Sequence, residues 1–225
     1  ENLQILETIS ENQNLYYGNA FLDGFANIKG PGENLSIEIV GSTNKGTSIT
    51  IPLSDSKNTG DLSYLSFNTK SEKINSKINN GLKVNLDLEF NKNAQIVVIL
   101  DPVSESKLDV NGLGNLDFLI NTTGNFNVFG NYAVDSGSYF YKSLGIVDRE
   151  FNLKKGSTII WNGDPYLAEL NIDAKYEIPG GANQAIILQK KNFNRKIPTN
   201  IDVNLTGNLS EINTPNFKIN FPNTS

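Results

Sequence analysis

The feature that most constrains this chain is a strict alternation of apolar and polar residues. The clearest run extends from Leu82 to Phe90, where every second residue is apolar and those between are polar. A period of two matches a β-strand, whose successive side chains point to opposite faces. The same pattern recurs at 35–39, 49–53, 116–120, 126–128, 169–176, 201–206 and 217–221. The repetition predicts an all-β chain of about a dozen short strands, each apolar on one face.

Turn residues punctuate these runs. We expect turns at Asn44–Gly46, Asn79–Gly81, Asn111–Gly112, Thr123–Asn125, Ser136–Gly137, Lys155–Gly156 and Asn162–Pro165. Residues 55–77 and 179–196 interrupt the pattern and are expected to be long or partly ordered loops. Leu3, Leu6 and Ile9 have helical spacing and predict a short helix within 2–14, whereas 96–100 is apolar on both sides and has no predicted orientation.

The composition argues against catalysis and metal binding. The chain has no His, Cys or Met, and so lacks the commonest general base and the softest metal ligands. Ser138 and Lys142 share one face of an expected strand, but a solvent-facing polar row explains them better than a nucleophile and its base. The acidic residues fit turns and outer faces, and no calcium or phosphate-loop motif occurs. We therefore expect no enzyme activity, no metal and no cofactor.

The charge distribution also argues against a nucleic acid as the partner. The net charge is −5, and arginine occurs only at Arg149 and Arg195, without the basic stripe that nucleic-acid binding requires. No apolar stretch approaches the roughly 18 residues of a spanning helix. Because the chain begins at Glu1 rather than Met, we expect a fragment of a longer protein, with any membrane anchor outside it, forming a single domain over 1–225.

A sheet with one apolar face must hide that face by closing, by folding over or by covering it with a ligand. Aromatic residues crowd the stretch from Phe126 to Trp161. A packed aromatic core is the more common explanation for such a cluster. From the residues alone, a closed core and a ligand-lined surface both stay open.

A series of segments resembles the C-terminal domain of the TamB family of translocation and assembly module proteins. In chain order the best-matching segments are Asn125–Tyr132, Ser136–Tyr141, Asp148–Trp161, Asn162–Pro165 and Ala168–Tyr176. Less specific matches are Tyr17–Phe21, Ile28–Pro31, Gly46–Leu53 and Val203–Pro215. By this resemblance we expect the stretch after Tyr176 to be shorter than the family pattern and the family's C-terminal tail to be truncated at Ser225.

The resemblance implies a fold and a function. Proteins of this family are anchored in the inner membrane of diderm bacteria and cross the periplasm as a long sheet folded like a taco. They work with an outer-membrane barrel protein of the TamA type, and are implicated in phospholipid movement and in assembly of outer-membrane proteins. By this resemblance we expect an elongated, strongly curved sheet with an apolar interior that forms an open groove.

The expected function is a periplasmic lipid conduit for phospholipid acyl chains. The residues predicted to line the groove are Val84, Leu86, Leu88, Phe118, Phe126, Val128, Leu170, Ile172, Val203 and Phe217. One alternative is a chaperone-like module that pairs its strand edge with outer-membrane proteins. Another is a structural spacer whose apolar face is a closed, dry core.

Overall fold

The computed structural model describes residues 3–9, 16–31, 34–52, 81–101, 103–121, 125–143, 147–183, 196–211 and 215–222. Within them the chain is all-β, as the alternation predicts, with a 13-stranded sheet, a separate two-stranded ladder and no α-helix. The large sheet consists of β1 (Leu3–Thr8), β2 (Tyr17–Lys29), β3 (Ser36–Thr43), β4 (Ser48–Pro52), β5 (Lys83–Phe90), β6 (Gln95–Asp101), β7 (Ser106–Asn121), β8 (Phe126–Ser143), β9 (Val147–Leu153), β10 (Thr158–Gly163), β11 (Glu169–Glu177), β14 (Asn200–Asn208) and β15 (Asn216–Asn220). The ladder consists of β12 (Ala182–Asn183) and β13 (Lys196–Ile197), and the turns η2 (Pro165–Leu167) and η3 (Leu209–Glu211) are single 3-10 turns.

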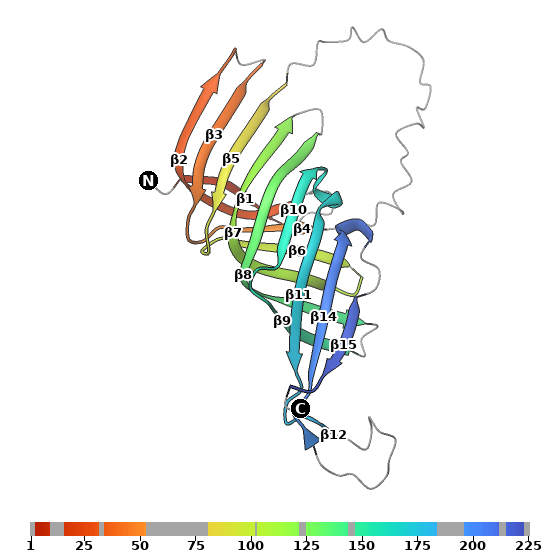
Figure 1. Cartoon of the computed structure of the whole chain (residues 1–225). Helices are drawn as coiled ribbons and strands as arrows, with labels where there is room; N and C mark the ends of the chain where they lie inside the picture. Colours follow the sequence, from red (N-terminus) through yellow and green to blue (C-terminus); the bar gives the residue numbers. More distant parts are fainter. Residues whose placement is uncertain are drawn as a thin grey trace, which may run out of the picture.

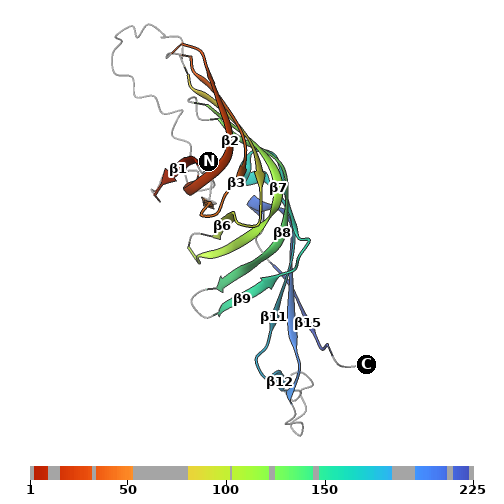
Figure 2. The same ribbon diagram turned by 90° about the vertical axis from the view of Figure 1, so that its left-hand side faces the viewer.

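The large sheet folds over on itself into two layers, because its longest strands cross from one layer into the other. β7 pairs with β6 through its first half and with β5 through its second half. β2 pairs in the same way with β4 and then with β3. β3, β5, β11 and β14 run steeply in front, while β1, β4, β6 and β9 cross behind them (Figure 1). A view from the side separates the two layers and shows the strong curvature of the front one (Figure 2).

The strand pairings also close a ring. From β7 through β5, β3, β2, β4 and β6 each strand pairs with the next, and β6 pairs with β7. The ring arises because turns break β3 from β4 and β5 from β6, and the broken strands pair in parallel, β3 with β5 and β4 with β6. The expected open groove is therefore not clear in the structure. The described residues form a closed six-strand core with further strands attached.

The long strands bend at positions where the sequence predicts turns. Asn111–Gly112 and Ser136–Gly137 both lie inside continuous strands, so the turns predicted there are wrong. The register between β7 and β8 shifts at Asn111 and Gly112, which marks an irregularity of the bulge type. Gly137 has a φ of 155° within β8. A glycine inside a strand marks a bend as readily as a turn, and here the glycines allow both strands to pass between the layers.

Two other expectations need correction. The segment predicted as an N-terminal helix contains β1, which pairs antiparallel with β2 and has a register irregularity between Gln4 and Leu6. The irregularity adds one residue to the strand, so that Leu3 and Leu6 are three residues apart instead of two or four. This spacing resembles that of a helix and explains the error. In the second predicted loop, β12 pairs with β13, while residues 184–195 lie outside the described residues. The first predicted loop, 55–77, lies wholly outside them.

The core lies between the two layers, on what we call the inner face of the sheet. Its largest fully buried side chains include Trp161, Tyr132 and Phe90. Leu108 and Val110 of β7 are fully buried on the rear layer, opposite the front-layer strands. In β6, Ile96 and Val98 are buried, which settles the orientation of the run that is apolar on both sides. The centre of the molecule is therefore a closed apolar core.

Candidate functional site

The inner face is built from cross-strand rows of apolar side chains. Leu86 of β5 lies opposite Phe118 of β7, and Phe118 lies opposite Val128 of β8. Further along the sheet, Ile172 of β11 lies opposite Leu205 of β14. These rows are apolar on each of the strands named, whereas elsewhere on the inner face the buried Thr43 lies opposite Leu22.

The residues predicted to line a groove differ in their accessibility. Those at the centre are at most 8% exposed: Leu88, Phe118, Val128, Leu170, Ile172 and Val203. Val84, Leu86 and Phe126 are half-buried, and Phe217 is 41% exposed. The structure thus brings the set together on one face but packs its middle into the core. The role of these residues in lining a lipid path stays a prediction.

At the upper end of the front layer in Figure 1, β2, β3, β5, β7 and β8 extend beyond the strands that cross behind them. We call the inner-face row at this end the upper rim, and its register joins Ile28, Ile37, Val84, Ile120 and Phe126 across five strands. Ile28 is 62% exposed, and the other members are half-buried. Each member is apolar, so the upper rim presents aliphatic and aromatic surface without a charged group.

A second rim lies where β9 of the rear layer faces the edge strand β15 of the front layer. This β9–β15 rim is formed by Tyr141, Arg149, Phe151, Tyr176, Ile201, Phe217 and Ile219. The ring centroid of Phe217 is 5.4 Å from that of Tyr141 and 5.8 Å from that of Phe151, so side chains of both layers meet here. Ile219 is 58% exposed. The rim thus combines aromatic contacts between the layers with exposed apolar surface on β15.

The predicted groove-lining set leaves out two aromatic residues at the very centre, although both belong to the aromatic stretch that a packed core explains. Tyr132 and Trp161 are 0% and 1% exposed, and neither the Tyr132 hydroxyl nor the Trp161 Nε1 has a well-aligned hydrogen-bond partner among the described residues. Burial raises the pKa of Tyr132 and of Tyr139, so both phenols are neutral at physiological pH. Alternation gives the face of these residues, but no local signal shows that the two layers meet over them.

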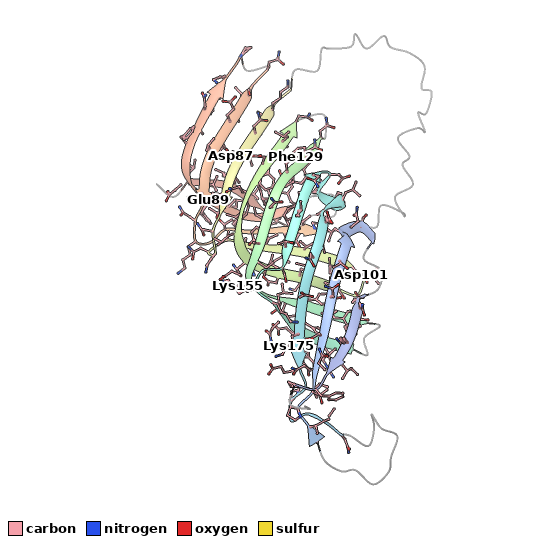
Figure 3. All side chains as sticks on the ribbon, in the orientation of Figure 1. Asp87, Glu89, Asp101, Phe129, Lys155 and Lys175 are labelled. Atoms are coloured by element: carbon pink, nitrogen blue, oxygen red, sulfur yellow. The ribbon has the colours of Figure 1, made fainter. Side chains whose placement is uncertain are left out.

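The outer face is polar and carries most of the charges. Asp87 and Glu89 of β5 are both exposed on it, and Phe129 of β8 adds an exposed ring (Figure 3). Asp87 lies directly opposite Asp117 of β7. The inner face is more continuously apolar than the outer face, although the outer face also exposes Phe25, Val40, Leu113 and Leu119.

A small ion-pair network ties the bends of the sheet together. Lys155 and Lys92 place their Nζ atoms 2.6 and 3.1 Å from Oδ1 of Asp135. Hydrogen bonds from Lys155 and then Lys92 lower the pKa of the Asp135 carboxyl. The network joins the turn after β9 and the turn after β5 to the bend of β8, and so supports the fold rather than a reaction.

Neither a metal centre nor a membrane-spanning helix is found among the described residues. No three His, Cys, Asp or Glu side chains in the described ranges gather closely enough to hold a metal ion. No helix within those ranges has the length and apolar character that crossing a membrane requires.

Comparison with known proteins places the chain in a family. No curated protein matches it. The family model described as the TamB C-terminal domain matches residues 2–225, nearly the whole chain. Proteins of this family are non-enzymatic transport and assembly modules of the bacterial envelope that work with an outer-membrane partner. The chain therefore belongs to the TamB C-terminal domain family and is part of a translocation and assembly module.

Proposed function

We propose that the inner face carries phospholipid acyl chains between the inner and outer membranes, as one module of a periplasmic conduit ending at a barrel protein of the TamA type. The observation that carries the proposal is the continuation of the apolar inner face beyond the closed core. Ile28 at the upper rim is 62% exposed, and Ile219 at the β9–β15 rim is 58% exposed. A contiguous apolar row on a sheet, rather than a single exposed residue, marks a place where another apolar body binds.

The apolar surface of the rims is suited to binding an acyl chain. Each methylene group removed from water contributes about 0.8 kcal/mol, so a lipid tail laid along a rim gains several kcal/mol. None of the five residues of the upper rim has a hydrogen-bonding side chain that would fix a ligand in one register, and the neighbouring Tyr16 packs its ring against Phe126 with the centroids 4.9 Å apart. A chain can therefore slide along the rim, as transport requires. The buried residues at the centre, such as Ile172, would line the path only where the two layers separate.

Site-specific photo-crosslinking in cells tests the proposal. A photo-reactive amino acid at Val84 or Phe126, both half-buried on the upper rim, is expected to capture phospholipid. The matched controls are the adjacent positions Asn85 and Asn127, whose side chains point to the outer face. Equal capture at rim and control positions, or capture at none of them, would contradict a lipid path on the inner face.

The chaperone alternative has one observation in its favour. Within the described part of the chain β15 pairs only with β14, so its other edge is open to an incoming strand. Photo-crosslinkers at Asn216 and Lys218 on β15 are expected to capture outer-membrane proteins if this edge assists their assembly. Capture there, together with no lipid at Val84, would favour the chaperone function over the conduit.

A further inference from the structure

Arg149 occupies an unusual place in this sheet, because it lies on the inner face. In β9, Arg149 alternates with Phe151 and Leu153, which are 2% and 9% exposed within the core. It lies opposite Tyr141 in the β8–β9 ladder. Its guanidinium carbon is 5.8 Å from the ring centroid of Tyr176, a cation–π arrangement. The exposed Arg149 side chain therefore lies over the Tyr176 ring of the β9–β15 rim.

No other cation of the large sheet shares this face within the described ranges. Register and alternation place the remaining strand lysines on the outer face: Lys29, Lys83, Lys107, Lys142, Lys175 and Lys218. Several of them have carboxylate partners, as in the pair between Lys142 and Glu105 at 2.6 Å. Arg149 has no carboxylate partner in the described part of the chain. Its Nη1 donates a hydrogen bond to the backbone oxygen of Asp148 at 2.6 Å, which leaves most of its N–H donors available.

The surroundings of Arg149 match an amphiphilic anion. Exposed apolar surface from Phe217 and Ile219 lies on the same rim, and the Tyr141 ring bridges the two layers by its contact with Phe217. A guanidinium presents parallel N–H donors that fit two oxygens of a phosphate. One ligand that satisfies both features is an acyl chain that carries a phosphate group.

We infer that Arg149 binds the headgroup phosphate of a phospholipid at the β9–β15 rim, while an acyl chain of the same lipid lies against Phe217 and Ile219. The inference rests on the proposed function and adds the chemistry of the headgroup to it. It also makes the two rims different. The upper rim is apolar throughout and binds only acyl chains, whereas the β9–β15 rim binds both the headgroup phosphate and an acyl chain of one lipid.

A comparison of two lipids with identical tails tests the role of the phosphate. The purified 225-residue chain is titrated in neutral detergent with dioleoylphosphatidylglycerol and with dioleoylglycerol, which lacks the phosphate, and binding is followed by native mass spectrometry. The wild type is expected to bind the phospholipid about 10-fold more tightly than dioleoylglycerol. This is the gain in affinity that one charge-assisted hydrogen bond provides. This preference should weaken as salt is raised, because the contact is partly exposed.

Three variants identify the residue responsible. Arg149→Gln is expected to abolish the preference while leaving dioleoylglycerol binding unchanged. Arg149→Lys is expected to keep part of it, since an ammonium retains the charge but not the fork geometry. The control is Lys107→Gln. Lys107 lies over the Phe140 ring at 5.1 Å on the outer face, and its loss should leave both affinities as they are. Circular dichroism and the thermal midpoint of each variant check that it folds as the wild type does.

The possible failures are distinguishable. If Arg149→Gln weakens both lipids equally, Arg149 only packs against the rings, which overturns the inference while lipid binding stands. Unchanged affinity for the phospholipid in Arg149→Gln overturns it as well. If the wild type binds neither lipid, the proposed function fails together with the inference. If Arg149→Gln loses its fold, the salt dependence of the wild-type preference decides, because a preference that does not weaken as salt is raised would overturn a contact between the guanidinium and the phosphate.

Discussion

The ring of Tyr132 lies against Gly112, with its Cε1 atom only 2.8 Å from the position that a Cβ at Gly112 would occupy. The backbone oxygen of Ala133 is closer still to that position, at 2.2 Å. Gly112 is therefore required where β7 bends between the layers, since any side chain there would push the neighbouring strand and the core ring apart.

Gly112→Ala is the first variant that follows. We expect it to lower the free energy of unfolding by about 1–3 kcal/mol, the range for overpacking a close-packed interior. Urea unfolding followed by tryptophan fluorescence measures the change, because Trp161 lies in the same core. Asn115→Ala, at an exposed position on the same strand, is the control and should change stability by no more than about 0.5 kcal/mol. Equal stability of wild type and Gly112→Ala would show that β7 and β8 adjust without loss.

A second variant concerns the buried hydroxyl of Tyr132. That hydroxyl has no well-aligned hydrogen-bond partner among the described residues, and only the Gly112 backbone lies close enough to lower its pKa, so Tyr132→Phe removes a poorly paired polar atom from the core. We expect the variant to be more stable by about 1 kcal/mol, as measured by the shift of the urea midpoint. Tyr17→Phe, at a half-buried position, should be close to neutral. A clear loss of stability in Tyr132→Phe would mean that the hydroxyl is hydrogen-bonded in solution.

The strands and their faces were predictable from sequence, because alternation records burial directly. The run from Leu82 to Phe90 predicts β5 within one residue of its observed start, with Leu88 and Phe90 buried and Asp87 and Glu89 exposed. The folding of the sheet into two layers was not predictable in the same way. A glycine that bends a strand and a glycine that forms a turn have the same local sequence, as Asn111–Gly112 demonstrates.

The accessibility of the candidate site residues could not be predicted from sequence for a similar reason. Alternation groups Val128, Leu170 and Ile172 on the inner face, but only the packing of one layer on the other decides that they are buried rather than accessible. Alternation could also have placed Arg149 on the inner face, because it alternates with Phe151 and Leu153. Its neighbours Asp148 and Glu150 instead suggest a solvated strand end. Closure of the six-strand ring depends on pairing between strands distant in sequence, which no local pattern encodes.

The two faces are expected to respond very differently to charge. Ile172 is fully buried opposite Leu205, so Ile172→Asp places an unpaired carboxylate in the core and should destabilise the fold by at least about 4 kcal/mol. Leu86→Asp, at a half-buried position, should have a smaller effect and is expected to impair lipid passage. Thermal and urea unfolding give the stabilities, and crosslinking at Val84 reports lipid.

The matched control on the outer face is Asp87→Lys. Asp87 is exposed and lies opposite Asp117, so the substitution replaces a like-charged cross-strand pair by an opposite-charged one. Its stability should stay within about 0.5 kcal/mol of the wild type or rise slightly. Similar losses for Asp87→Lys and Ile172→Asp would mean that the inner and outer faces are wrongly assigned.

The last prediction concerns acid. Hydrogen bonds from Lys155 and Lys92 hold the pKa of Asp135 below its usual value in the folded chain, whereas in the unfolded chain it returns to about 3.9. The ionised carboxylate therefore stabilises the fold at pH values above the unfolded pKa, and this contribution is lost as pH falls through the folded pKa. We expect the wild type to exceed Asp135→Asn in thermal midpoint at neutral pH, with the difference shrinking on acidification. Because the pair is exposed, the difference should be modest and should shrink further in high salt. Lys155→Gln removes the main partner and should reproduce most of the effect, whereas a difference that is constant across the pH range would show that the network does not contribute through its charge.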